Sequence, residues 1–535
     1  MVKFKFLLAT ILLLITHLSV AQVDRYVVFF TDKASSNYSV DRPEEFLSAR
    51  AIKRRTDQNI AVIENDLPVN EAYINQLKEL GLETYFTTKW MNGVLVQGTQ
   101  AQISQAESLA IVSNVDYVAP GIRVTPFEDN APALGPFFSP AESSIDTEFQ
   151  NRQLGIDDMH ADGYTGDGLM IAVMDGGFPG VNESMVFQHF DTEDKLVYTL
   201  DIVLNQTNVF IGSGHGTEVT SVIAGKYGNE FVGAAYDASM LLFRTEDNDS
   251  EYRIEEYNWL FAAEIADSIG VDIINSSVGY RDFDDPSMDY DFDELDGRNS
   301  VITKANDLAF SKGIIPVTSA GNTASNITAP ADAFDILSVG SVDREGEKST
   351  FSAFFDSEDG RTKPEVVALG SSTTVLKSGG NIGSNSGTSF ASPIVAGFTA
   401  GIWQAFPEST NAQIIELIKQ SGTNANDISD LLGYGIPGYQ RIIGGDVTNT
   451  SSELSNDLQL FPNPSNNGMF RIDVNDQTVF SMIVYVRDLS GKLLNIAHFD
   501  QNDQLTLDIS SLPAATYLVT IETGRGFYNQ KVVKQ

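Results

Sequence analysis

The stretch Leu169–Gly177 reads LMIAVMDGG, an unbroken apolar run that ends in an aspartate and two glycines. Continuous apolar strands are typical of a parallel sheet whose two faces are both covered. Helical patterns over 255–269 and 300–312, ending at Gly270 and Gly313, separate this run from others like it. We expect those further strands at Met240–Phe243, Ile273–Ile274, Ile314–Thr318 and Ile336–Val339. The pattern predicts an α/β domain with a parallel sheet and helices on both faces.

Functional side chains gather at the carboxyl ends of parallel strands, and Asp175 stands at such an end. A carboxylate there can orient an imidazole, although an aspartate in a strand–loop turn also has an ordinary structural role. Among the histidines, His215 is flanked by glycines at the start of a helical run, in Gly212–Thr217 (GSGHGT), which favours it as a general base. The other four histidines lack this setting: His17, His160, His189 and His498.

Ser389 lies in Gly387–Pro393 (GTSFASP), where Pro393 suits an early helix position. A serine at a helix N-terminus sits where the helix dipole favours developing negative charge, although serine is also a common N-cap. Ala391 replaces the second glycine of the lipase motif G-x-S-x-G, which makes an esterase a secondary interpretation. Each residue alone is weak evidence for catalysis, but the order Asp175, His215, Ser389 is the order of the subtilisin triad.

Five motifs in order resemble the subtilisin-like serine peptidases, peptidase family S8, over about residues 150–445. They are Ile171–Gly177 (IAVMDGG), Gly214–Gly225 (GHGTEVTSVIAG), Val271–Gly279 (VDIINSSVG), Ser319–Asn322 (SAGN) and Gly387–Gly397 (GTSFASPIVAG). The resemblance implies that Ser389 is the nucleophile, His215 its base and Asp175 the residue that orients the base. It also implies that Asn322, otherwise a turn residue after Gly321, donates to the oxyanion.

The same resemblance assigns the substrate cleft. Ser277, Val278 and Gly279 match the strand that pairs with the bound peptide, and Ser319, Ala320 and Gly321 match the opposite wall of the S1 pocket. Backbone pairing is tolerant of sequence, and small wall residues leave the pocket open. We therefore expect broad endopeptidase activity on protein and peptide substrates, with a preference for a large apolar P1 residue.

Composition excludes several other classes. The chain has 34 Lys and Arg against 72 Asp and Glu, a net charge of −38, which repels nucleic acids and anionic lipid. The absence of cysteine removes thiol nucleophiles, Cys-ligated zinc and iron–sulfur clusters. No H-E-x-x-H motif occurs, which argues against a metallopeptidase.

The N-terminus has the pattern of a secretory signal peptide. Two lysines precede the apolar run Phe6–Ile15, and Ser19-Val20-Ala21 is a small-x-small cleavage site. The run is shorter than the ~20 residues of a membrane-spanning helix. We expect residues 1–21 to be removed on export, and no transmembrane segment in the mature chain.

Residues 22–125 show the order β-α-β-β-α-β of a ferredoxin-like α+β domain. Asn92-Gly93 predicts a hairpin, and Thr99 with Gln102 predicts a capping box. By itself this domain could be regulatory, but subtilases commonly carry a propeptide of this fold, so the resemblance implies a zymogen. We expect a processing region at 126–149, where four prolines indicate extended chain, and a solvated helix face for the basic segment Arg50–Arg55.

The C-terminal region changes character after the catalytic domain, which we place at 150–445. Residues 446–456 read as a linker, and about seven short strand patterns in 457–535 predict a small all-β sandwich. A carbohydrate-binding module would have this pattern too. Five short motifs, however, resemble the type A C-terminal sorting domain of the Bacteroidetes type IX secretion system, although Ala515 replaces the family's usual glycine. They are Leu458–Pro464 (LQLFPNP), Gly468–Ile472 (GMFRI), Asp488–Gly491 (DLSG), Leu512-Pro513 with Tyr517, and Lys531–Lys534 (KVVK).

This second resemblance implies passage through the periplasm and outer membrane by the type IX secretion machinery, which would use residues 457–535. The product would then be secreted or attached to the cell surface. A competing function is a non-proteolytic surface adhesion protein that uses the subtilase fold with an idle triad.

An acidic loop lies between Arg281 and Arg298, and no cofactor is required by the chemistry predicted above. Oxygen-rich loops suit Ca²⁺, which many subtilases bind. The spacing is not that of an EF-hand, because Glu294 stands where the turn glycine would be. We expect a solvated acidic loop, with Ca²⁺ binding as the alternative. The acidic residues are Asp282, Asp284, Asp285, Asp289, Asp291, Asp293, Glu294 and Asp296.

Overall fold

The computed structural model describes residues 22–34, 36–122, 126–140, 146–356, 361–444, 458–474, 481–487, 493–500, 505–523 and 526–535. The chain divides into two compact units, Met1–Ser39 with Glu64–Arg123, and Val40–Ile63 with Val124–Gln535. The expected signal peptide at 1–21 and the expected linker at 446–456 lie outside the described residues. Within the described part of the chain, no helix is long and apolar enough to cross a membrane.

The first unit is a four-stranded antiparallel sheet with two helices, as expected for a ferredoxin-like domain. Its sheet has the order β2-β3-β1-β4. The predicted capping box of Thr99 and Gln102 is present, and Asn92 adopts a left-handed φ of 56° in the hairpin. The elements are β1 (Val23–Phe30), α3 (Glu71–Glu79), β2 (Glu83–Thr88), β3 (Gly93–Thr99), α4 (Gln100–Glu107) and β4 (Val112–Pro120).

The second unit contains a seven-stranded sheet in which every neighbouring pair is parallel, which confirms the predicted fold class. The strand order is β15-β12-β11-β10-β5-β9-β6. Sequence patterns missed the two edge strands, because β6 is only partly buried and β15 is a run of four residues. The strands are β5 (Met170–Asp175), β6 (Leu196–Asp201), β9 (Ser239–Arg244), β10 (Ile273–Ser276), β11 (Ile315–Ser319), β12 (Leu337–Val342) and β15 (Val366–Leu369).

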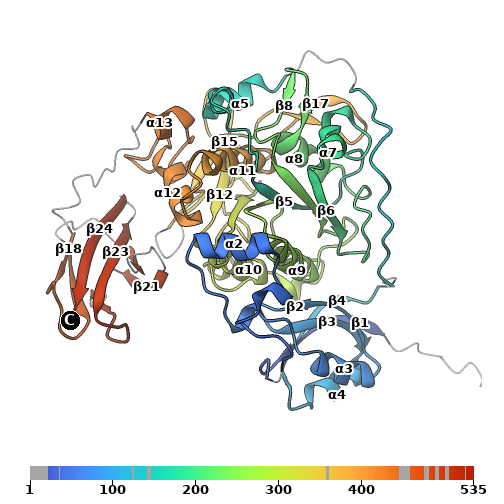
Figure 1. Ribbon diagram of the computed structural model, residues 1–535, viewed down its shortest axis with the longest axis horizontal. Coiled ribbons are helices and arrows are strands. Elements are labelled where there is room, and N and C mark those ends of the chain that lie inside the picture. The colour runs from blue at the N-terminus through green and yellow to red at the C-terminus, as the bar shows by residue number, and fades with distance from the viewer. Residues whose placement is uncertain are drawn as a thin grey trace, which may run out of the picture. The chain divides into compact units, whose positions relative to one another are not determined.

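Helices cover both faces of this sheet (Figure 1). On one face α8 (His215–Ala224) packs against α11 (Thr388–Ala405), and on the other α9 (Ile254–Ile269) packs against α10 (Val301–Ser311). Helix α11 is buried along almost its whole length, as expected for a core helix of a globular domain. The predicted stops after α9 and α10 are present, since Gly270 and Gly313 have φ values of 106° and 90°.

Shorter elements complete the second unit. The helices are α5 (Glu148–Leu154), α6 (Ile156–Ala161), α7 (His189–Thr192), α12 (Asn411–Gln420) and α13 (Tyr439–Ile443), and the single 3₁₀ turns are Pro43–Glu45, Met185–Phe187, Pro286–Met288 and Phe292–Glu294. The strand pairs are β7 (Lys226–Tyr227) with β8 (Phe231–Val232), β13 (Phe355–Asp356) with β14 (Thr362–Lys363), and β16 (Thr373–Leu376) with β17 (Ile382–Asn385).

The basic helix α2 (Ala49–Asp57) belongs to the unit with the parallel sheet, although its sequence lies inside the N-terminal region. The prediction of a solvated helix face for Arg50–Arg55 holds for Lys53, whose side chain is 74% exposed, and is wrong for Arg54 and Arg55. Arg54 and Arg55 are only 5% and 1% exposed, because both guanidinium groups pair with the buried Asp267. The spacing of basic residues along a sequence does not show whether a carboxylate distant in the sequence pairs with them in the fold.

The C-terminal residues form the predicted all-β module of seven strands. One sheet has the order β18-β19-β22 and the other β21-β20-β23-β24, with a shared apolar core that includes Phe470, Val484 and Ile521. The strands are β18 (Leu458–Phe461), β19 (Met469–Val474), β20 (Ser481–Arg487), β21 (Leu493–Asp500), β22 (Thr506–Asp508), β23 (Ala515–Thr523) and β24 (Gly526–Lys534).

Helix α8 can approach β5 closely because its second residue is glycine. A β-carbon on Gly216 would lie 2.4 Å from the carbonyl oxygen of Gly177 and 3.0 Å from Cβ of Asp175. Both atoms belong to the end of β5 and the turn that follows it, so neither can move without disturbing the packing of the backbone.

We predict that Gly216→Ala lowers the free energy of unfolding by about 1–3 kcal/mol, because it forces α8 away from β5. Urea unfolding followed by circular dichroism measures this change. Gly379→Ala is the matched control, since the nearest atom to its β-carbon would be 4.0 Å away. Equal stability of the two variants would contradict the packing argument.

Candidate functional site

Asp175 and His215 meet where the last residue of β5 faces the first residue of α8. The Nδ1 atom of His215 lies 3.0 Å from Oδ1 and 2.9 Å from Oδ2 of Asp175. The Asp175 side chain is 2% exposed, whereas the imidazole remains 32% exposed. The backbone N–H of Gly176 also donates to Oδ1, over 2.7 Å, and holds the carboxylate in place. The pair therefore has a buried orienting end and an accessible imidazole edge.

Opposing effects set the pKa of His215. Burial alone would lower it, but the charge of Asp175 and the hydrogen bond to that carboxylate outweigh burial, so the pKa is raised above 6.5. Glu218 and Glu246 add smaller effects in the same direction. A raised pKa means that the imidazole accepts a proton more readily than a free histidine does.

Ser389 lies in the first turn of α11, where the N-cap residue is Gly387 rather than the serine. Its hydroxyl donates a long hydrogen bond of 3.4 Å to the carbonyl of Ser277. The next residue, Phe390, places its ring centroid 5.5 Å from that of His215. The structure thus brings the start of α11 beside the histidine.

Pro393 lies inside α11 and not at its first positions, which corrects the sequence expectation. A proline has no N–H, so the carbonyl four residues earlier, that of Ser389, loses its helical partner. The hydroxyl of Ser277 donates to this carbonyl over 2.9 Å. Ser277 and Ser389 are therefore held together by two hydrogen bonds, one in each direction.

Asn322 follows the carboxyl end of β11 and lies against the start of α11. Its Oδ1 atom accepts from the backbone N–H of Thr388 over 2.9 Å and from the Thr388 hydroxyl over 3.1 Å. This fixes the orientation of the amide and leaves Nδ2 as its donor end, 3.7 Å from the position of a β-carbon on Gly387. The amide therefore has a donor group near the Ser389 turn.

The six residues that the sequence assigned to a substrate cleft lie at and just after the carboxyl ends of β10 and β11. Along the first segment, Ser277 is buried, Val278 is half-buried and Gly279 is exposed, before Tyr280 pairs with the backbone of Ala329. Along the second, Ser319 and Ala320 are buried and Gly321 has a left-handed φ of 109°. Only glycine adopts that conformation readily, which explains its place between Ala320 and Asn322.

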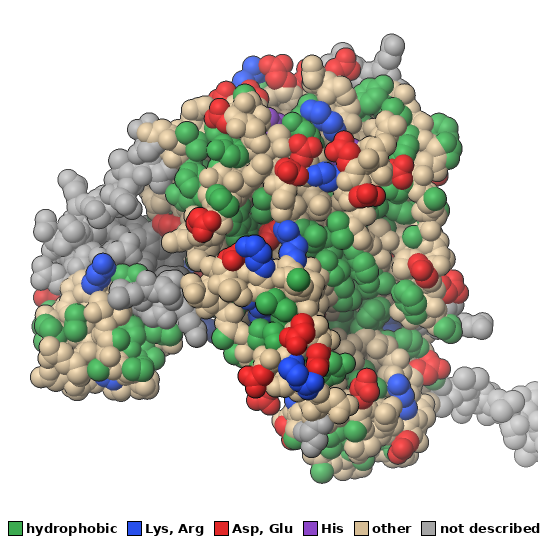
Figure 2. All heavy atoms as spheres, in the orientation of Figure 1, with side chains coloured by type: hydrophobic (Ala, Val, Ile, Leu, Met, Phe, Trp, Pro, Cys, Tyr) green, Lys and Arg blue, Asp and Glu red, His purple; other side chains and the backbone are tan. Residues whose placement is uncertain are grey.

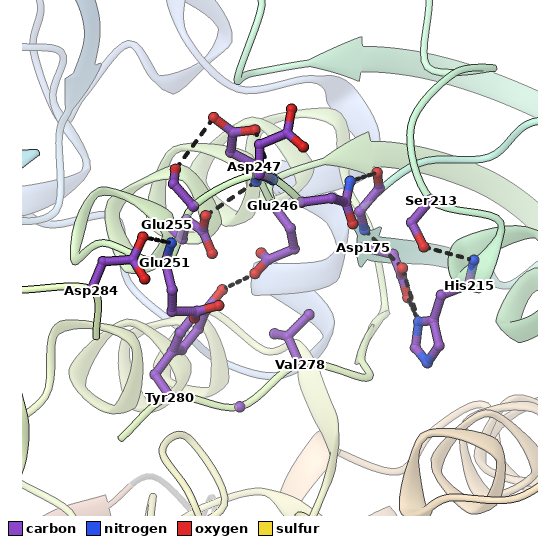
Figure 3. A pocket seen from close by; sticks show the side chains of 15 residues that line it. Asp175, Ser213, His215, Glu246, Asp247, Glu251, Glu255, Val278, Tyr280 and Asp284 are labelled. Atoms are coloured by element: carbon purple, nitrogen blue, oxygen red, sulfur yellow. Dashed lines mark hydrogen bonds and ion pairs between the residues drawn. The ribbon is translucent and has the colours of Figure 1, made fainter. Parts of the chain in front are cut away.

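A pocket of about 650 Å³ opens beside the Asp175–His215 pair, and carboxylates dominate its wall (Figure 3). Figure 3 shows Glu246, Glu251 and Glu255 converging on one side while His215 lies on the other. We call this cavity the acidic pocket. Its lining residues are Asp175, Gly176, Ser213, His215, Glu246, Asp247, Asn248, Asp249, Ser250, Glu251, Glu255, Val278, Gly279, Tyr280 and Asp284.

Burial raises the pKa values of three carboxyl groups of the pocket, those of Glu246, Glu251 and Glu255. Burial and the neighbouring Glu246 and Asp284 raise the pKa of Glu251 to about 7. Burial also raises the pKa values of Glu246 and Glu255, which stand close to each other. Glu246 accepts a hydrogen bond of 2.5 Å from the Tyr280 hydroxyl, and Glu255 accepts one of 3.1 Å from the backbone N–H of Asp247. The pocket is thus partly protonated below neutral pH and gains negative charge as the pH rises.

Sequence reasoning missed the acidic pocket. The signal was available, because Glu246, Asp247, Asp249 and Glu251 follow β9 at its carboxyl end, the same position that singled out Asp175 after β5. The residues carry no motif, however, and their meeting with Tyr280 and Asp284 depends on a loop far along the chain.

The other histidine rings that the structure describes, His160 and His189, are partly buried, which lowers their pKa values. Nε2 of His160 bonds the carbonyl oxygen of Ala234 over 3.0 Å, and burial lowers its pKa. Burial lowers the pKa of His189 to about 4. The side chain of His498, and all of His17, lie outside the described residues.

Carboxylates of the acidic loop serve as local caps. Asp285 accepts from the backbone N–H of Ser287, Asp289 from that of Phe283, and Asp284 from that of Glu251. Across the described part of the chain, no group of three or more Asp, Glu, His or Cys side chains is arranged to hold a metal ion. The described geometry therefore does not fit a Ca²⁺ site built on such a group.

Comparison with known proteins relates three segments of the chain to known domains. Residues 166–435 match the subtilase family, peptidase S8, and residues 25–130 match the peptidase S8 propeptide domain of Bacteroidota. Residues 459–535 match a secretion system C-terminal sorting domain. The sorting domain marks a protein exported across the outer membrane, to the medium or the cell surface.

Subtilisin E of Bacillus subtilis (strain 168) is 29% identical over 273 residues, which are 50% of this chain and 63% of that protein. The membrane-bound transcription factor site-1 protease of Rattus norvegicus is 31% identical over 247 residues, 44% of this chain and 21% of that protein. The chain thus spans less than two thirds of the length of these relatives.

Among solved structures, a mutant of the epidermin leader peptide processing serine protease of Staphylococcus aureus aligns with a TM-score of 0.53. It is 15% identical and covers 79% of this chain and 100% of its own, a similarity of fold alone. The subtilase match spans half of the chain and includes the strand and helix ends described above. The chain belongs to the subtilase family, peptidase family S8.

Proposed function

We propose that the protein is a serine endopeptidase that hydrolyses peptide bonds through an acyl-enzyme, with Asp175, His215 and Ser389 as its triad. The observation that carries the proposal is the bidentate contact of the His215 Nδ1 atom with the buried Asp175, beside the helix turn that holds Ser389. A buried carboxylate fixes the tautomer of the imidazole and leaves Nε2 to take a proton.

In the proposed reaction, the Ser389 hydroxyl turns from the Ser277 carbonyl toward His215 and attacks the scissile carbonyl carbon. His215 takes the hydroxyl proton and then gives it to the leaving amine, which releases the first product. Water then attacks the acyl-enzyme with His215 again as base, which frees the acid product and restores Ser389. The Asn322 amide and the backbone N–H of Ser389 would donate to the oxyanion in both steps.

We propose that residues 22–125 act as a propeptide that is cut off within 126–149. The stretch 126–140 is mostly exposed, as a processing site must be, and Phe127 and Phe138 are 56% and 62% exposed. Backbone bonds from Glu128 to Asn205 and from Phe138 to Glu183 hold the stretch along the surface of the catalytic domain. We propose further that the type IX secretion machinery recognises residues 457–535.

The alternative function, adhesion with an idle triad, is less well supported. A protein that does not need the chemistry has no reason to keep the Asp175–His215 bond, the oriented Asn322 amide and the two-way Ser277–Ser389 contact together. Catalysis uses the oriented imidazole and the oriented amide directly, and the Ser277 contact holds the Ser389 turn until the hydroxyl attacks.

We predict that Ser389→Ala abolishes both casein hydrolysis and the loss of N-terminal residues up to about residue 145. The expected fall in kcat is about 10⁶-fold, the loss known for the serine of subtilisin. Assays of casein hydrolysis and intact mass over time, on the signal-free chain, measure the two effects.

Ser386→Ala is the control, because this exposed serine lies three residues before the nucleophile. If the parent chain stays inert after an added protease has removed its N-terminal region, the peptidase proposal fails and adhesion takes its place.

The raised pKa of His215 predicts the acid limb of the pH–rate profile. Neutral imidazole is the active form, so kcat/KM should rise with pH through a midpoint above 6.5. Asp175→Asn removes the charge that raises this pKa, so the midpoint should fall below that of the parent, with a loss of rate of about 10⁴-fold. Peptide hydrolysis across the pH range tests this, and exposed Asp191→Asn should leave the midpoint in place. An unmoved midpoint in Asp175→Asn would rule out this pair as the titrating group.

The acidic pocket predicts a preference for cationic substrate side chains near the scissile bond, because Val278, Gly279 and His215 line both the pocket and the proposed cleft. Glu251 gains its charge as the pH rises through about 7. The ratio of kcat/KM for a lysine substrate to kcat/KM for its norleucine analogue should therefore increase between pH 6 and pH 8. Glu251→Gln should reduce that gain by roughly threefold or more.

Ratios of kcat/KM for paired lysine and norleucine peptides measure this preference. Exposed Glu230→Gln removes one carboxylate elsewhere and should leave the ratio unchanged. A ratio that does not vary with pH in the parent chain would contradict a role for Glu251 in substrate selection.

A further inference from the structure

The basic helix α2 caps the C-terminal end of α9. The last carbonyls of a helix have no partner within it, and positive charge is favoured beside them. The N–H of Ser48 donates to the carbonyl of Ser268 over 2.9 Å, and its hydroxyl donates to that of Ile269 over 2.7 Å. Arg50 Nε donates to the carbonyl of Gly270 over 2.9 Å. The end of one catalytic-domain helix is thus completed by a segment that precedes the catalytic domain in sequence.

Two further arginines of α2 bind one buried carboxylate. Arg54 Nη2 lies 2.6 Å from Oδ1 of Asp267, and Arg55 Nη2 lies 2.9 Å and 2.8 Å from its Oδ1 and Oδ2. Asp267 is fully buried. Arg54 also donates to the carbonyls of Val271 and Lys312. A buried carboxylate that loses its partners is strongly destabilising, so this contact matters to the catalytic domain as well as to α2.

Gln58, just after α2, joins two more helix ends. Its Nε2 donates to the carbonyl of Gly313, which follows α10, over 2.9 Å. Its Oε1 accepts from the N–H of Asn411, the first residue of α12, over 2.9 Å. The segment therefore supplies donors and acceptors to the ends of three helices of the catalytic domain.

We propose that the ends of α9 and α10, with Asp267 and with Asp272, which pairs with Arg50, form a receptor site for an arginine-bearing helix, and that residues 40–63 stay bound there after the rest of the propeptide is removed. The mature enzyme then consists of the catalytic domain and this segment, joined without a covalent bond. The proposal rests on the proposed function for the cut within 126–149, and it adds cuts near the two ends of the segment, at Val40 and Ile63.

The exposure of the segment agrees with such retention. Its ends are accessible, since Val40 and Ile63 are 37% and 48% exposed, whereas Arg54 and Arg55 between them are buried. Cuts near the ends would leave the buried contacts intact. The part of α2 that remains at the surface is basic, and Figure 2 shows Lys and Arg side chains gathered over it.

The test uses the full chain with Ser389→Ala and with recognition sites for a sequence-specific protease inserted beside Val40, beside Ile63 and within the exposed stretch 129–133. After digestion, gel filtration and intact mass report what elutes with the catalytic domain. We expect one copy of segment 40–63 with each catalytic domain in the parent. Arg54→Met combined with Arg55→Met should lose it.

Lys53→Met is the matched control, because this lysine also lies on α2 but its side chain is 74% exposed and pairs with Asp57 on the same helix. The segment should stay bound in this variant. If the double variant fails to fold, Arg54→Lys replaces it, since lysine keeps the charge but loses the planar fork that reaches three groups. We expect the segment to dissociate at least about tenfold faster from the Arg54→Lys chain.

Immediate loss of the segment from the digested parent would overturn the proposal, and so would retention by the double variant equal to that of the parent. Because the added protease makes every cut and Ser389 is absent, neither result depends on peptidase activity. Failure of the receptor site is therefore distinguishable from failure of the casein assay.

Discussion

The parallel register of the central strands is the constraint on which the rest of the site depends. Met174, Ser276 and Thr318 lie side by side on β5, β10 and β11, so the next residues, Asp175, Ser277 and Ser319, emerge at one level of the sheet edge. The chain leaves β5 toward one side for β6 and β9 and returns on the other side for β10, which opens a crevice at this edge. Helices α8 and α11 begin at this same edge, which brings His215 and Ser389 to the level of Asp175.

Local backbone chemistry then fixes the fine geometry. Gly216 lets α8 approach β5 closely enough for the imidazole to meet a buried carboxylate. Pro393 frees the Ser389 carbonyl, and the Ser277 hydroxyl takes the place of the missing N–H. In both cases a residue without a reactive side chain, Gly216 or Pro393, determines the position of a functional group. The acidic pocket adds a field of negative charge to the same edge and raises the pKa of His215 through Glu246.

The catalytic domain is completed at several helix ends by residues 40–63. Helix termini carry unpaired carbonyls in any fold, and here arginine and glutamine side chains from a separate part of the chain satisfy them. The division of the protein into functional parts therefore does not follow the order of its sequence. Residues 40–63 lie within the sequence matched by the propeptide domain but fold with the parallel sheet.

The sequence by itself determined the fold class, the helix stops at Gly270 and Gly313, the hairpin at Asn92 and the candidate residues Asp175, His215, Ser389 and Asn322. These depend on local signals, apolar periodicity, glycine conformation and short motifs, which a linear sequence carries in full. Only the tertiary structure decided that Arg54 and Arg55 are buried and that Glu246, Glu251 and Tyr280 share a pocket. The physical reason is that the environment of a charged side chain is set by partners distant in the sequence, such as Tyr280 for Glu246 and Asp267 for Arg54. Charge spacing along the chain contains no record of these partners.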